Sequence, residues 1–251
     1  MGEERHFETG GGDYAAHRPT YPPALAQALA ARCARTTHAL DVGCGTGQLS
    51  VLLAGAFERV TATDPSAAQI ANATAHERIV YRVEPAETIG LPDASVDLVV
   101  AAQAAHWFDL DRFYAEVRRV ARPGAVLALV SYGVPAIDAG IGPLAERLER
   151  FYWHEIHRHW PPGRAHVEQG YRALAFPFDE KPFAPLAITR DWDFSALEGY
   201  IRTWSAAKRA AQAGDHAALE DGLADLATLW GGADTRHRVA WPLVARLAVI
   251  S

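Results

Sequence analysis

The sequence is short of cysteine and of long apolar runs, and each shortage excludes a class of protein. Its two cysteines, Cys33 and Cys44, are too few for a disulfide framework or a cysteine-based metal knot. No apolar run reaches the roughly 18 residues that a membrane helix needs. The first residues, MGEERHFETGGGDY, lack the apolar core of a signal peptide. We therefore expect a cytoplasmic protein in a reducing compartment, without membrane contact.

Lysine is also scarce, because Lys181 and Lys208 are the only two. Nearly all positive charge is arginine, and the net charge of −6 argues against a nucleic-acid partner, which clustered basic residues would bind. The densest basic group, Arg118, Arg119 and Arg122, has helical spacing. We interpret it as a solvated helix face.

Short apolar runs alternate with helical patterns five times along the first half of the chain. The expected strands are 38–43, 59–64, 78–83, 95–103 and 125–133. This alternation predicts a parallel sheet with helices on both faces. The carboxyl ends of such strands form a common rim, where ligands bind.

The pattern changes after residue 133. We expect a helix over 142–160, a loop over 161–185, a strand over 186–194, helices over 195–213 and 215–230, and a last strand within 237–250. The stretch between the fifth strand and the last two is too short for an independent domain. A cap over the strand rim is its natural place.

The loop LDVGCGTG joins the first strand to the first helix and carries Gly43, Gly45 and Gly47. Glycines allow a sharp turn and a close approach of the backbone to a ligand, with helix N–H groups facing it. A dinucleotide loop has the spacing G-x-G-x-x-G, but position 48 is glutamine here. Asp41, two residues before the first glycine, would disfavour a pyrophosphate and suits an ammonium or sulfonium.

Asp64 ends the second strand, 17 residues after Gly47. Its carboxylate can accept two hydrogen bonds from a ribose diol. The alternative is that Asp64 caps the helix that begins after Pro65. Together with the glycine loop, the ribose role is favoured.

The fourth strand runs into AAHWFD, which places His106 and Trp107 on the rim. An imidazole titrates near neutral pH, so His106 can act as a base, as a hydrogen-bond donor or as part of the pocket wall. We favour shape and polar contact over proton transfer. Trp107 is interpreted as a wall or apolar anchor.

The stretch WHEIHRHW (153–160) is rich in histidine but is not H-E-x-x-H, because position 158 is arginine. We predict no metal site. Trp153 either lines the cap above an acceptor or lies on a partly exposed amphipathic helix. Trp204, on the helix before the last strand, either faces the acceptor pocket or belongs to the core. The chain also lacks the G-x-S-x-G pattern of hydrolases.

Five motifs together carry a resemblance, namely LDVGCGTGQLS, ATDPS, VEPAETIGLPDASVDLV, AAHWFD and EVRRVARPGAVLAL. In order and spacing they resemble the class I S-adenosylmethionine-dependent methyltransferases with a type-11 methyltransferase domain. The nearest group is the trans-aconitate methyltransferase-like small-molecule enzymes, which DYAAHRPTYPPAL and YIRTWSAAKRA also resemble.

The resemblance implies an α/β fold with a Rossmann-like, seven-stranded, mostly parallel sheet, an antiparallel last strand, helices on both faces and a helical cap after the fifth strand. It implies one domain, 1–251, divided into an N-terminal helical lid (1–36), a cofactor-binding core (37–133), a cap (134–185) and C-terminal strands and helices that complete the sheet (186–251).

The resemblance also assigns roles to residues. S-adenosylmethionine would be held by the glycine loop with Asp41, by Asp64 on the ribose, by Ala86 and Glu87 at the adenine, and by Gln103 near the sulfonium. Pro65 would lie beside it, and Tyr14 and Arg18 would close over it. The acceptor would meet Tyr21, His106, Trp107, Tyr132, Trp153 and Trp204.

The implied activity is methyl transfer to a small molecule, with oxygen of a carboxylate or hydroxyl as the favoured acceptor atom. A carboxylate is ionised at neutral pH and needs no base. A catalytically silent binding protein is one alternative. An NAD(P)-linked oxidoreductase, which the loop spacing disfavours, is another. We expect a monomer or a homodimer.

Overall fold

A computed structural model describes residues 19–138 and 141–251. Its centre is a sheet in the order β3-β2-β1-β4-β5-β9-β6. The five parallel strands are β1 (His38–Val42), β2 (Arg59–Asp64), β3 (Ile79–Val83), β4 (Val96–Ala102) and β5 (Ala121–Tyr132). The predicted α/β fold with a mostly parallel sheet is confirmed.

A long strand, β9 (His237–Val249), lies antiparallel to β5 and completes the sheet. It also pairs with β8 (Leu186–Trp192) and with two strands of two residues each, β6 (Ala136–Ile137) and β7 (Glu180–Lys181). The seven predicted strands correspond to β1–β5, β8 and β9. The two short strands had no recognisable period in the sequence.

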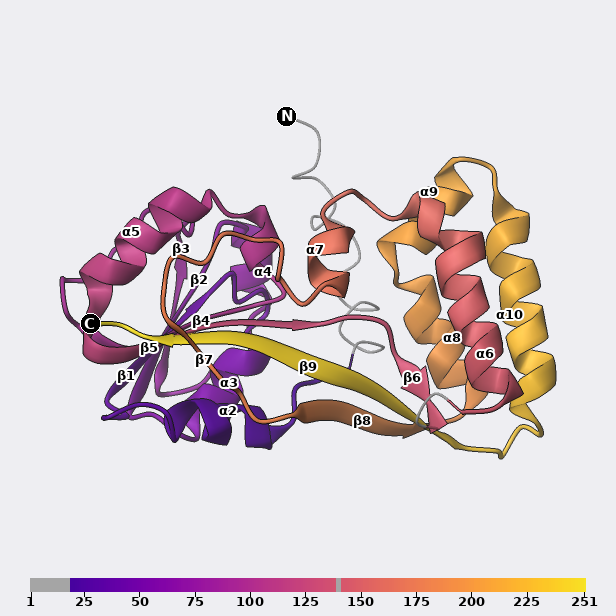
Figure 1. The fold of residues 1–251 in the computed structure, drawn as a ribbon, viewed down its shortest axis with the longest axis horizontal. Helices are drawn as coiled ribbons and strands as arrows, with labels where there is room; N and C mark the ends of the chain where they lie inside the picture. Colours follow the sequence, from indigo (N-terminus) through magenta and orange to yellow (C-terminus); the bar gives the residue numbers. More distant parts are fainter. Residues whose placement is uncertain (1–18, 139–140) are drawn as a thin grey trace.

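Helices cover both faces of the sheet (Figure 1). They are α2 (Pro23–Ala30), α3 (Gln48–Ala54), α4 (Ala67–Ala71) and α5 (Leu110–Val120). In β4, Leu98 and Val100 pack into the apolar cluster that contains α2 and α3, whereas Val99 and Ala101 pack into the cluster that contains α5. Burial on both faces explains why β4 is a continuous apolar run instead of an alternating one.

The prediction of a solvated face holds for Arg118, which is exposed, and is wrong for Arg119 and Arg122, which are half-buried. Arg122 Nη1 donates to Asp97 Oδ1 at 2.7 Å, and Asp97 is buried with its side chain 4% exposed. Arg118 Nη2 donates to the carbonyl of Pro177, and its guanidinium lies over the Phe178 ring. The physical reason is that charged side chains here neutralise carboxylates and saturate carbonyls of neighbouring segments.

A second group of helices lies apart from the α/β core (Figure 1). It contains α6 (Pro143–Arg150), α8 (Phe194–Arg202), α9 (Ser205–Gln212) and α10 (His216–Trp230), with α7 (Arg164–Glu168) between this group and the core. Helix α6 packs against α10, so segments far apart in the chain belong to one group of helices. An amphipathic helix must bury its apolar stripe, and here these helices bury one another's.

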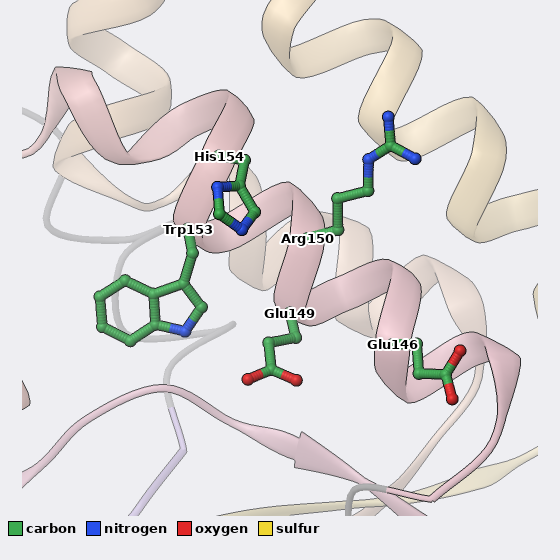
Figure 2. Close-up of a pocket in the computed structure, with 5 residues that line it drawn as sticks. All are labelled: Glu146, Glu149, Arg150, Trp153 and His154. Atoms are coloured by element: carbon green, nitrogen blue, oxygen red, sulfur yellow. The ribbon is translucent and has the colours of Figure 1, made fainter.

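The helix expected over 142–160 changes its winding. After α6 it continues as a π-helical turn (Phe151–Ile156) and a 3₁₀ turn (His157–His159). Trp153 is 40% exposed on its outer side. It lies in an open recess of about 340 Å³ with Glu146, Glu149, Arg150 and His154 (Figure 2).

An aromatic cluster fills the helical group. Trp204 is 2% exposed. Its ring centroid lies 6.2 Å from Phe151, 5.5 Å from Tyr152, 5.6 Å from Trp160 and 5.6 Å from Tyr200.

None of the helices within 19–138 and 141–251 is both long and apolar enough to cross a bilayer.

We predict that Gly222→Ala destabilises the protein by about 1–2 kcal/mol, although alanine favours helices. A Cβ at Gly222 of α10 would lie 2.2 Å from Cδ2 of the buried Phe151 ring. The free energy of unfolding in urea tests this. Ala224→Gly, at an exposed site of the same helix, measures the propensity contribution alone. An increase in stability for Gly222→Ala would show that α10 does not pack as described.

Candidate active site

The glycine loop lies at the centre of the rim, because β1 is flanked by β2 and β4. Gly43, Gly45 and Gly47 have φ angles of +71°, +56° and +82°, a region that other residues rarely adopt. A Cβ at Gly43 would lie 2.5 Å from the Cβ of Ala104, and a Cβ at Gly47 would lie 2.1 Å from Tyr81 Oη. The loop therefore packs closely against the ends of β4 and β3.

Gly45 is the open point of this loop. Among residues 19–138 and 141–251, a Cβ there would meet only Gln69 Oε1, at 3.7 Å. This side of the loop therefore leaves room for a ligand against the backbone.

Asp64 ties the loop to β2. Its Oδ2 accepts from the Gly45 N–H at 2.9 Å, and its Oδ1 accepts from the Ser66 N–H at 2.9 Å. Ser66, not Asp64, is the N-cap of α4, since its Oγ accepts from Gln69 N at 3.3 Å. The helix-cap alternative for Asp64 is therefore wrong. Each carboxylate oxygen has a second lone pair with which to accept from a ligand, and Pro65 follows directly.

Asp41 lies beneath the loop and is 1% exposed. Its Oδ2 accepts from the Ser50 hydroxyl at 2.6 Å. The pKa of this carboxyl is raised to about 7, chiefly by burial; the Ser50 hydrogen bond opposes the rise and the charge of Asp64 adds to it. Asp41 therefore exchanges its proton near neutral pH.

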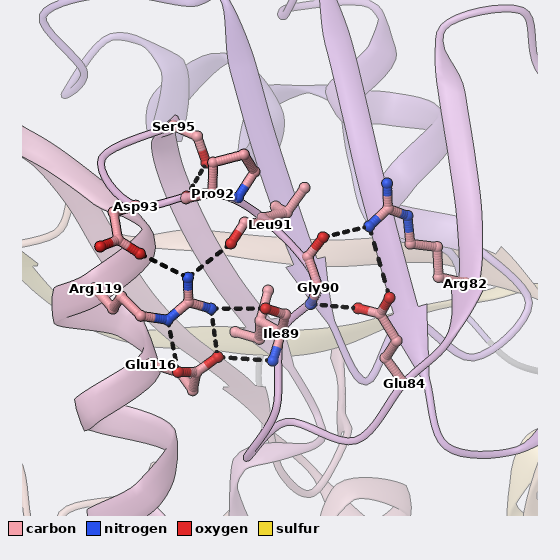
Figure 3. A network of polar contacts seen from close by, with 10 residues as sticks. All are labelled: Arg82, Glu84, Ile89, Gly90, Leu91, Pro92, Asp93, Ser95, Glu116 and Arg119. Carbon is pink, nitrogen blue, oxygen red and sulfur yellow. Dashed lines mark hydrogen bonds and ion pairs between the residues drawn. The ribbon is translucent and has the colours of Figure 1, made fainter.

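The segment after β3 carries Ala86, which is 4% exposed, and Glu87. The Glu87 Oε1 accepts from the backbone N–H of Asp109 at 2.8 Å, which links this segment to the start of α5. Arg119 of α5 then holds the rest of the segment, because it donates to the carbonyls of Ile89 and Leu91 (Figure 3).

The same network includes carboxylates on both sides of the segment (Figure 3). Glu116 accepts from the Ile89 N–H at 2.7 Å and pairs with Arg119, and Glu84 accepts from the Gly90 N–H at 3.0 Å. These hydrogen bonds to the backbone of residues 89–91 fix the segment that carries Ala86 and Glu87 beside the rim.

Gln103 follows β4 with a φ of +57°, which is strained for a residue with a side chain. Its N–H donates to the Val130 carbonyl at 2.8 Å, and its Nε2 donates to the Tyr132 carbonyl at 2.7 Å. These two bonds to β5 fix the turn that leads from β4 to His106. Strain of this kind is concentrated at functional sites.

His106 lies in a 3₁₀ turn, Ala105–Trp107. Its Nδ1 lies 3.1 Å from Tyr171 Oη. Burial, followed by the charges of His166 and Arg164, lowers the pKa of His106 to about 4, so the imidazole is neutral at physiological pH. The Trp107 ring lies 4.9 Å away and is 45% exposed.

The other expected acceptor residues are placed differently. Tyr21 and Tyr132 are buried, with ring centroids 5.9 Å apart in an edge-to-face contact. Trp204 lies in the aromatic cluster and Trp153 in the outer recess of Figure 2, so their acceptor roles remain predictions. Tyr14 and Arg18 lie outside the described residues.

The structure thus brings together the glycine loop, Asp64, Glu87, Gln103 and His106 at one rim. It adds Tyr171, which sequence reasoning missed. Tyr171 is fully buried with a φ of +63°, and no local pattern predicts a bulky aromatic in that conformation.

The helical stretch 151–168 adds a further polar group. Tyr152 Oη donates to Glu168 Oε1 and accepts from Arg164 Nε, the latter at 2.9 Å. His157 Nε2 lies 3.3 Å from Glu168 Oε2. These side chains satisfy one another's hydrogen-bonding groups where α7 meets the helical group.

Residues 40–129 match the family described as a methyltransferase domain. A putative methyltransferase of Dictyostelium discoideum is 33% identical over 193 residues, covering 76% of this chain and 73% of that protein. An uncharacterized methyltransferase of Mycobacterium tuberculosis is 41% identical over 125 residues, which span 49% of this chain and 51% of that protein. The solved structure of a putative type II methyltransferase from Anaeromyxobacter dehalogenans is 47% identical with a TM-score of 0.86, covering 92% of this chain and 97% of that chain.

We predict that Asp41→Asn changes how stability depends on pH. The folded pKa of Asp41 is about 7 and its ordinary value is 3.8. Folding therefore favours the protonated form, and the wild type loses stability as pH rises from about 4 to about 7. The amide does not titrate, so the variant does not lose this stability. The free energy of unfolding of the variant minus that of the wild type should therefore be about 2–4 kcal/mol larger at pH 8 than at pH 5. Asp111→Asn, at an exposed carboxylate, is the control; parallel curves for Asp41→Asn would contradict the shift.

Proposed function

Because the chain belongs to the class I S-adenosylmethionine-dependent methyltransferases, we propose that it methylates an oxygen atom of a small-molecule acceptor. S-adenosylmethionine is its cofactor and supplies a methyl group carried on a sulfonium. The observation that supports this proposal most is that the glycine loop with Asp64 and the turn from Gln103 to His106 lie on the same rim. The close contact between Gly43 and Ala104 brings them together.

The described residues fit this cofactor. The open side of Gly45 leaves room for a ligand against the backbone. Asp64 retains acceptor capacity for a ribose diol, and the spacing of the glycine loop differs from that of a pyrophosphate-binding loop. Gly43, Gly45, Gly47, Asp64, Ala86, Glu87 and Gln103 would hold it.

The acceptor would bind beyond Gln103, beside His106 and Trp107 and below α7. When bound, S-adenosylmethionine would supply a methyl group for in-line transfer to the acceptor oxygen, with a neutral thioether as the leaving group. Holding the two partners in line supplies about 7–11 kcal/mol of barrier reduction. The residues around the rim therefore serve chiefly to position the acceptor and to exclude water.

The state of His106 supports an acceptor that needs no strong base. With a pKa of about 4, this imidazole is a weak base for a hydroxyl group, whose own pKa is far higher. A carboxylate oxygen is already ionised at neutral pH and reacts without losing a proton. Oxygen of a carboxylate is thus favoured over that of a hydroxyl.

We predict that Asp64→Ala weakens binding of S-adenosylhomocysteine at least tenfold, because a charged hydrogen-bond acceptor is lost and the Gly45 N–H loses its partner. Isothermal titration calorimetry measures this, with Asp111→Ala as a control that retains wild-type affinity. Unchanged affinity in Asp64→Ala would remove Asp64 from the cofactor site. NADH binding without S-adenosylhomocysteine binding would instead indicate an oxidoreductase.

Turnover is tested by incubating the protein and S-adenosylmethionine with a library of small carboxylic acids and alcohols. We expect S-adenosylhomocysteine release with at least one carboxylic acid, and mass spectrometry should show the methyl group on its oxygen. Methylation of nitrogen or carbon alone would refute the choice of oxygen. Tight S-adenosylhomocysteine binding without release across the library would favour a catalytically silent binding protein.

A further inference from the structure

Tyr171 is held in its strained conformation from outside. Arg246 of β9 donates through Nη1 to the carbonyls of Tyr171 at 3.1 Å and Leu174 at 2.7 Å. Arg246 is itself fixed by Glu180, with Nη2 and Oε2 2.8 Å apart. A strained backbone persists only where its surroundings over-determine it. The clamp therefore maintains the direction in which the Tyr171 side chain points.

That direction is toward His106. The Tyr171 side chain is fully buried, and its Oη lies 3.1 Å from Nδ1 of His106. The two ring centroids are 5.8 Å apart. The Tyr171 hydroxyl is buried and the His106 imidazole is partly buried, so the direction of the hydrogen bond between them determines where the His106 hydrogen lies.

Tyr171 is the donor of its hydrogen bond with His106. Burial is the largest influence on the Tyr171 hydroxyl, and it raises the pKa of that group above its ordinary value. Tyr171 is therefore an intact hydroxyl with one hydrogen to donate. In the described part of the chain, His106 Nδ1 is the acceptor in contact with it. If Nδ1 donated instead, the tyrosine hydrogen would be buried without an acceptor, which is costly.

A neutral imidazole carries one hydrogen, so accepting at Nδ1 leaves it on Nε2. Within 19–138 and 141–251, His106 Nε2 has no hydrogen-bond partner, and it is not among the buried unsatisfied atoms. The adjacent Cδ2 lies 3.5 Å from where a Cβ of Gly163 would be. Gly163 directly precedes α7, so this edge of the ring faces the start of α7.

We propose that Tyr171 is a positioning residue that keeps His106 in the tautomer protonated at Nε2, so that His106 donates a hydrogen bond to an oxygen of the acceptor. The presence of an acceptor there rests on the proposed function, whereas the tautomer is a property of the protein alone. Tyr171 itself does not touch the acceptor. His106 orients the acceptor and takes no proton from it.

Nuclear magnetic resonance of protein labelled with ¹⁵N-histidine tests the tautomer directly. The chain has 11 histidines, and the His106→Gln variant identifies the His106 signals by their loss. Between pH 6 and pH 8 we expect the wild type to show a protonated Nε2 and an unprotonated Nδ1. Tyr171→Phe keeps the ring but removes the hydroxyl, and should shift His106 to a mixture of both tautomers.

Tyr114→Phe is the matched control. Tyr114 is also buried, and its hydroxyl donates to the Ala175 carbonyl at 2.7 Å, so its loss should leave the His106 signals unchanged. A wild-type Nδ1–H tautomer would overturn the proposal, and so would a Tyr171→Phe spectrum identical to the wild type. Even if Tyr171→Phe fails to fold, a wild-type Nδ1–H tautomer would overturn the proposal. The tautomer is measured without any ligand, so this result does not depend on whether S-adenosylhomocysteine binds.

Discussion

The close packing of the glycine loop against its neighbours is the constraint on which the site depends. Gly43 contacts Ala104 so closely that no side chain fits between them, and the Gly45 N–H is bound by Asp64. These contacts join the ends of β1, β2 and β4 into one surface. The loop can expose its backbone to a ligand because its other side is packed against protein.

The buried ionisable groups around this surface are tuned by desolvation. Burial pushes the carboxyl of Asp41 toward neutrality, and it keeps the imidazole of His106 neutral. Both effects reduce the charge buried at the rim. A site built in this way depends on position and on directed hydrogen bonds more than on strong acids or bases, which suits a displacement with a good leaving group.

The long strand β9 relates the two parts of the molecule. Its carboxyl-terminal half pairs with β5 in the core, and its amino-terminal half pairs with β8 toward the helical group (Figure 1). Arg246 of this strand also clamps the backbone of Tyr171, so the strand that closes the sheet helps to fix a residue beside His106. Sheet completion and site geometry are therefore linked through one side chain.

The sequence by itself determined the α/β sheet, the place of the glycine loop and the position of His106 at the rim, because local period and glycine spacing carry that information. Only the tertiary structure decided that Arg119 and Arg122 bind neighbouring segments, that Trp204 is core and that Tyr171 meets His106. Those contacts join residues far apart in the chain, and the left-handed backbone at Tyr171 runs against local preference. Long-range packing, which no local pattern encodes, set them.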